Sequence, residues 1–85
     1  MKILRITELE NRFIRLVEDQ YVDQGLDFAV YTTEFKIQIK VLFFWVTIKT
    51  YDYSYDDYSN INSVDQEIAY NQQCAEETFD FLINN

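Results

Sequence analysis

The first quarter of the chain spaces its apolar residues as an amphipathic helix does. Over residues 3–21 the apolar side chains fall within about 160° of a helical wheel, and the charged side chains take the other side. Thr7 and Glu10 fit a capping box, and Gly25 supplies a residue suited to a helix end. The pattern therefore favours a helix from about Thr7 to Val22.

A β-hairpin is the alternative for the same segment. Residues 2–8 and 13–18 would be its strands, and Glu10 and Asn11 would form its turn, since asparagine tolerates the left-handed conformation that tight turns require.

From residue 28 onward the chain is rich in β-branched and aromatic residues and has no glycine or proline. Apolar and polar residues alternate over 34–41, so one face of a strand is buried there and the other is wet. The phase of the alternation reverses between Val41 and Val46, which favours a hairpin, with a β-bulge in one long strand as the alternative. Residues 28–33 are either a further strand or the beginning of the next one.

The segment 51–58 reads Y-D-Y-S-Y-D-D-Y and has the two-residue period of a strand. A polar loop over 56–62 follows, and Ser63 with Gln66 fits a helix cap. A helix is predicted over 64–83. Its apolar stripe consists of Val64, Ile68, Ala75, Phe79 and Leu82.

These elements predict an α+β fold in one domain over 1–85: a helix, two or three antiparallel strands, and a C-terminal helix packed on one face of the sheet. The hairpin alternative at the start of the chain replaces this with a four-stranded antiparallel sheet and the C-terminal helix.

The charges divide the chain in two. All seven basic residues lie within 1–49, where seven acids balance them, whereas residues 50–85 hold eight acids and no lysine or arginine. The net charge of −8 therefore belongs to the second part. A charge of this sign opposes binding to nucleic acids and to anionic membranes, and it favours a basic protein partner.

If strand 51–58 and the C-terminal helix lie side by side, their acids form one negative surface, which could enter a basic groove that otherwise holds DNA or RNA. The competing interpretation is a solvated face that keeps a small protein soluble. The predicted partner-binding residues are Asp52, Asp56, Asp57, Tyr58, Asp65, Glu76, Glu77 and Asp80.

Aromatic residues form three further candidates for contact. Tyr51, Tyr53 and Tyr55 are predicted to alternate inward and cover the core, which leaves Tyr58 exposed. The run 43–45 (Phe-Phe-Trp) would be a costly exposed patch at a hairpin tip, and burial of at least two of the three is favoured. A strip on the helix could be the seam of a homodimer. It consists of Tyr70, Cys74 and Phe81.

Several functional classes lack the residues they need. The chain has no histidine and a single cysteine, Cys74, so neither a zinc site nor a disulfide within the chain is expected. There is no glycine-rich phosphate loop or hydrolase motif, and we expect no cofactor and no catalysis. The longest apolar run, 41–46, is too short to cross a bilayer, and an early arginine argues against a signal peptide. A cytoplasmic location is expected.

In its short length, its lack of catalytic residues and its gathered acids, the chain resembles the small acidic phage-encoded inhibitors of bacterial defence, notably anti-CRISPR proteins. The acids that carry the resemblance are Asp52, Asp56, Asp57, Asp65, Glu67, Glu76, Glu77 and Asp80. The resemblance implies an inhibitor that occupies the nucleic-acid channel of a host nuclease in the host cytoplasm. A composition typical of A+T-rich genes also points to a phage or another mobile element. The alternative is a small virion or scaffold protein that self-associates through its aromatic residues.

Overall fold

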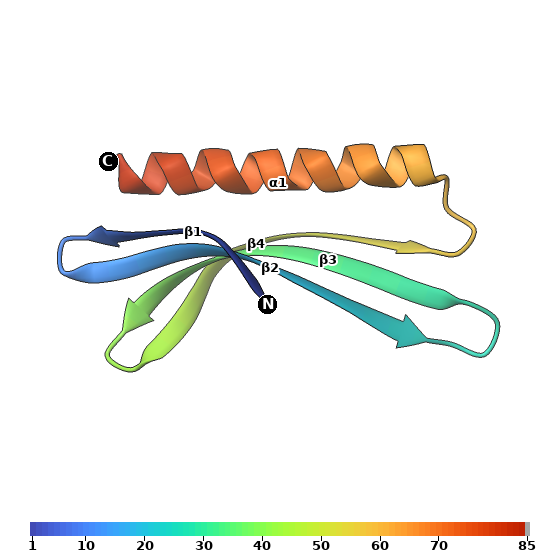
Figure 1. The fold of residues 1–85 in the computed structure, drawn as a ribbon, viewed down its shortest axis with the longest axis horizontal. Helices are drawn as coiled ribbons and strands as arrows, with labels where there is room; N and C mark the ends of the chain where they lie inside the picture. The colour runs from blue at the N-terminus through green and yellow to red at the C-terminus, as the bar shows by residue number, and fades with distance from the viewer. Residues whose placement is uncertain (85) are drawn as a thin grey trace.

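The computed structural model of the protein describes residues 1–84, which form one antiparallel sheet and one helix (Figure 1). The strands follow one another across the sheet in the order β1-β2-β3-β4, so each pairs with its neighbour in sequence. The α+β class is confirmed, and of the two arrangements expected the four-stranded one is found. The elements are β1 (Lys2–Leu9), β2 (Arg12–Gln24), β3 (Ala29–Val41), β4 (Phe44–Asp56) and α1 (Ile61–Ile83).

The predicted helix over 7–22 is wrong: β1 and β2 form a hairpin that turns at Glu10 and Asn11. Both turn residues have positive φ, 49° and 68°, as the favoured two-residue hairpin turn requires. The helical spacing arose because β2 carries apolar residues on both faces. Leu16 lies in the core under α1, whereas Val17, on the opposite face, is also fully buried. When both faces of a strand carry apolar residues, their spacing along the sequence can resemble the 3.6-residue period of a helix.

Gly25 lies in the turn between β2 and β3 and does not end a helix. Its amide donates a hydrogen bond to the carbonyl oxygen of Phe28 at 2.9 Å. A Cβ atom at position 25 would stand 2.7 Å from that oxygen, so the turn requires glycine because of a close approach. β3 then begins at Ala29, so residues 29–33 are the beginning of the strand that follows.

The expected hairpin between Val41 and Val46 is confirmed, with Leu42 and Phe43 as its turn. Leu42 has φ 57°, a left-handed conformation that is unusual for leucine. A β-bulge is present as well: the pairing of β3 with β4 skips Ile48, which reverses the faces of β4 on either side of it. The change of phase in the sequence therefore has two sources.

α1 begins three residues before the predicted start, because Asn60 and not Ser63 is the N-cap. The Asn60 side chain accepts hydrogen bonds from the amides of Asn62 and Ser63 at 2.9 and 3.3 Å. The predicted apolar stripe is confirmed as the packing face. Val64, Ala75 and Phe79 are buried, and α1 covers a core that includes Ile14, Leu16, Phe35 and Ile37.

The helix covers one face of the sheet, and no other element of residues 1–84 covers the opposite, open face (Figure 1). Register places Tyr51, Tyr53 and Tyr55 opposite Phe35, Thr33 and Tyr31, on the face that α1 covers. All three are half-buried. The hydroxyl groups of Tyr51 and Thr78 form a hydrogen bond of 2.6 Å, in which either can be the donor. The tyrosines therefore alternate inward, as expected.

Candidate protein-binding surface

The five carboxylates of α1 lie on a helix that contains no lysine or arginine. Four of them are exposed and Glu76 is half-buried. We call these acids the helix carboxylates: Asp65, Glu67, Glu76, Glu77 and Asp80. The helix is about 34 Å long, and all of them except Glu67 fall within about 120° of its circumference, where they form an extended strip; Glu67 lies on the other flank.

Within residues 1–84, Asp80 is the one helix carboxylate with a basic partner closer than 4 Å. Arg5 Nη1 donates to Asp80 Oδ1 at 2.6 Å, and the guanidinium carbon lies 4.6 Å from the centre of the Phe79 ring. Glu77 accepts a hydrogen bond from the side chain of Gln73 at 3.0 Å, which leaves its charge uncompensated. The strip therefore keeps most of its negative charge.

Asp56 and Asp57 hold the connection between β4 and α1. Asp57 accepts hydrogen bonds from the amide of Ala29 at 3.0 Å and from the Tyr31 hydroxyl at 2.8 Å. These two donors, the amide first, lower the pKa of the Asp57 carboxyl. Asp56 Oδ1 accepts from the amide of Tyr58 at 3.0 Å and from the Ser59 hydroxyl at 3.2 Å. Both acids therefore shape the start of the helix.

Tyr58 projects from this connection with 79% of its surface exposed, and its ring makes an edge contact with Phe28 at a centroid distance of 6.2 Å. The predicted exposure of this tyrosine is confirmed. An aromatic side chain with a polar tip thus lies just before the N-terminus of α1.

Asp52 does not join the other predicted residues. In the strand register Asp52 lies opposite Glu34 of β3. Both residues lie on the open face, because Tyr51 and Tyr53 on either side of Asp52 point toward α1. The structure therefore gathers seven of the eight predicted residues along α1 and its preceding connection. Glu67, which was counted among the gathered acids but not among the contact residues, lies on the same helix.

Charges on the open face compensate one another. Lys36 Nζ lies 2.9 Å from Asp19 Oδ2 and 3.7 Å from Glu34 Oε1. The hydrogen bond between Lys36 and Asp19 lowers the pKa of Asp19 and raises the pKa of Lys36. Desolvation and the neighbouring Glu34 raise the pKa of the Tyr21 hydroxyl. Ion pairs therefore compensate part of the charge on the open face, whereas on α1 they compensate Asp80 alone within residues 1–84.

The aromatic run 43–45 contradicts the expectation that at least two of its members are buried. Phe43 and Phe44 are 90% and 70% exposed. Trp45 is half-buried and lies on the open face, where the Arg15 guanidinium carbon is 3.9 Å from its ring centre. On α1, Tyr70 and Phe81 are exposed and Cys74 is half-buried, as a contact strip requires. A hydrogen bond with Cys74 raises the pKa of Tyr70.

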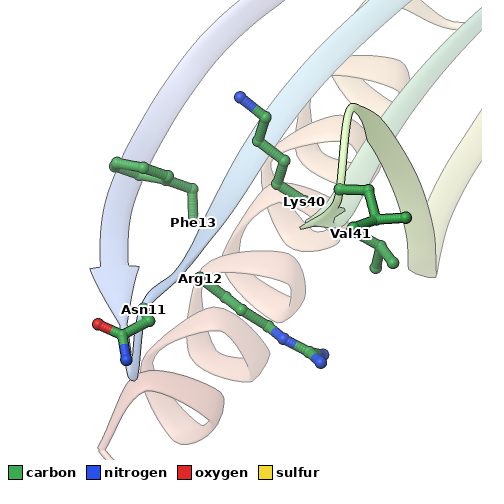
Figure 2. A pocket seen from close by; sticks show the side chains of 6 residues that line it. Asn11, Arg12, Phe13, Lys40 and Val41 are labelled. Atoms are coloured by element: carbon green, nitrogen blue, oxygen red, sulfur yellow. The ribbon is translucent and has the colours of Figure 1, made fainter.

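A hollow of about 420 Å³ lies between the tips of the two hairpins (Figure 2). We call it the tip cleft; it is lined by Asn11, Arg12, Phe13, Lys40, Val41 and Leu42. A second hollow of about 320 Å³ lies beside α1, where Tyr51, Cys74 and Phe81 are among its lining residues. In the part of the chain that the structure describes, no three side chains of His, Cys, Asp or Glu are grouped to hold a metal ion.

Comparisons of the chain with protein-family models, with curated proteins and with solved structures gave no match. No helix among residues 1–84 combines the length and the apolar character needed to cross a membrane.

Proposed function

We propose that the protein is a non-catalytic inhibitor that places its acidic helix on the basic nucleic-acid-binding surface of a host protein. Its biological role would be that of a phage counter-defence factor of the anti-CRISPR type, acting in the cytoplasm. One observation carries the proposal: α1 presents five carboxylates and no cation, and Arg5 neutralises Asp80 alone among them within residues 1–84.

Carboxylates can replace phosphates because arginine and lysine bind both through charge-assisted hydrogen bonds. A basic groove built for a nucleic acid attracts the strip over a distance, which speeds association at low ionic strength. The compensated charges around Lys36 make the open face a weaker candidate for such a partner.

The helix also holds its charges in place before binding. Val64, Ala75 and Phe79 fix α1 on the sheet, and Asp57 fixes the connection that leads into it. Ordering costs on binding are therefore small, since the backbone that carries the carboxylates is already ordered. Tyr58 adds an exposed aromatic at the end of the strip, and tyrosine is enriched in protein interfaces.

Co-purification from host lysate tests the proposal. The expected partner is a nucleic-acid-binding protein that is released by rising salt and by excess DNA or RNA, because both compete for its basic surface. A variant with Asp65→Asn, Glu67→Gln, Glu76→Gln and Glu77→Gln should lose the partner.

A control variant with Glu8→Gln, Glu10→Gln, Asp23→Asn and Asp27→Asn removes the same charge from exposed positions outside α1. It should retain the partner. An acidic partner, or equal retention by the helix variant and the wild-type protein, would contradict the proposal.

A structural role through self-association is a second candidate, and the exposed Phe43 and Phe44 favour it. The two functions need different surfaces, since the helix carboxylates would repel one another in a contact between copies.

A further inference from the structure

The tip of the β3–β4 hairpin consists of four consecutive apolar residues. Val41, Leu42, Phe43 and Phe44 are 38%, 82%, 90% and 70% exposed. Together they leave on the order of 500 Å² of apolar surface in water, near the upper end of the largest patches found on monomers. The turn uses leucine at a left-handed position where Asn or Gly is ordinary. Leu42 therefore places its apolar side chain at the tip at a cost in backbone conformation.

The tip cleft adjoins this apolar tip and shares Val41 and Leu42 with it. Figure 1 shows that the β3–β4 hairpin bends away from α1, whereas the β1–β2 hairpin stays beneath the end of the helix. Figure 2 shows Phe13 and Arg12 extending from β2 in opposite directions at the cleft. A cavity of about 150 Å³ holds a benzene ring, so about 420 Å³ accommodates a phenylalanine side chain.

This end of the molecule carries little of the negative charge of the chain, and a two-fold contact at the tips brings only Lys40 and Arg12 of each cleft near their counterparts. Residues 35–51 contain three lysines and no acid, and the cleft adds Arg12. A contact between helix strips would instead oppose four carboxylates with four. An arginine beside an aromatic ring is an arrangement the chain already uses twice, at Phe79 and at Trp45.

The edge of β4 is less suited to a second copy. The bulge at Ile48 and the charge of Lys49 lie in the middle of the strand, and both features hinder pairing with a further strand. Contact through the β3–β4 hairpin is therefore confined to its tip.

We propose that two copies of the chain form a dimer in which Phe43 of each copy enters the tip cleft of the other, beside Arg12. Because tip and cleft adjoin in one copy, a single two-fold rotation fills both clefts, and the assembly closes at two chains. Each copy contributes a tip of on the order of 500 Å², so the contact buries on the order of 1,000 Å² in total, the size of a small interface. The dimer leaves the helix carboxylates exposed and does not depend on the proposed inhibitor function.

Sedimentation velocity of the purified protein tests the dimer, over concentrations from about 1 to about 200 μM. We expect the mass to rise from 10.3 kDa to twice that value and to stop there. Phe43→Ser should raise the dissociation constant roughly thirtyfold or more, as loss of a central aromatic anchor does. Salt from about 0.05 to about 0.5 M should strengthen the dimer, because it screens two like-charged chains.

Phe81→Ser is the matched control, since it removes an exposed phenylalanine from α1. It should leave the dissociation constant unchanged, and thermal unfolding should show both variants folded. A protein that stays monomeric, a dimer that survives Phe43→Ser or is lost in Phe81→Ser, or an assembly larger than two chains would each overturn the proposal. The opposite salt dependence of partner binding keeps this result separate from that of the inhibitor.

Discussion

Arg5 and Asp80 join the edge strand β1 to the last turns of α1 through a hydrogen-bonded ion pair of 2.6 Å. The same guanidinium lies over the ring of Phe79, a buried residue of the helix. Arg5 thus contacts the helix through an ion pair with Asp80 and through the face of the Phe79 ring. The contact holds β1, the shortest strand, to the element that carries the acidic strip.

Replacement of Arg5 separates these two contributions. Arg5→Ala removes both and should lower the free energy of unfolding by about 1 kcal/mol, whereas Asp80→Asn removes only a half-exposed pair and should cost roughly 0.3 kcal/mol. Urea denaturation of the two variants measures the difference. Equal losses would mean that the ion pair alone stabilises this contact.

The hydroxyl groups of Tyr51 and Thr78 should act as one unit. Their hydrogen bond of 2.6 Å lies partly buried between β4 and α1. Tyr51→Phe and Thr78→Val should each lower the free energy of unfolding by about 1 kcal/mol, since each removes the bond and leaves one polar group without its partner. The double variant should cost little more than either one, as a double-mutant cycle by urea denaturation would show. Additive losses would contradict the coupling.

Asp57 should make stability depend on pH in the acid range. Its pKa in the folded protein is lower than the ordinary value of 3.8, so its hydrogen bonds stabilise the fold above that value. The stabilisation should disappear as the pH falls through the folded pKa. Asp57→Asn should therefore lower the midpoint of thermal unfolding at pH about 7, and the gap to the wild-type protein should narrow as the pH falls below 3.8. A gap that stays constant across this range would exclude the ionised carboxylate as its cause.

Replacement of Leu42 should affect the stability of the monomer and the affinity of the dimer in opposite directions. Its φ of 57° costs a leucine about 1 kcal/mol, and glycine adopts this angle freely. We expect Leu42→Gly to raise the midpoint of thermal unfolding of the monomer and to weaken the dimer, because it removes apolar surface from the tip. A variant that associates as strongly as the wild-type protein would show that Leu42 lies outside the contact.

The sequence predicted the elements whose two sides have different surroundings. Residues 34–41 alternate clearly because β3 has core on one face and a charged network on the other. The stripe of α1 was equally readable, since a helix on an open sheet buries one side. β2 was misread because Leu16 and Val17 are both buried, on opposite faces, and a single sequence does not show which face each residue occupies.

The acidic surface was predicted in part for a similar reason. The acids of α1 share one helix, so their proximity follows from the helix itself. Asp52 was placed with them, although alternation with the inward Tyr51 and Tyr53 already turned it to the other face. The exposure of Phe43 and Phe44 could not be read from the sequence, because it depends on how far the β3–β4 hairpin bends away from α1 (Figure 1).

Every strand pairs with its neighbour in sequence, and this order affects how the chain folds during synthesis. Each hairpin closes a short loop, so the sheet can form early and quickly as the strands leave the ribosome. α1 is synthesised after all four strands and is needed to cover Leu16, Phe35 and Ile37. Until it docks, the nascent sheet shows an apolar face to the cell, and we expect chaperones to bind the chain during that interval.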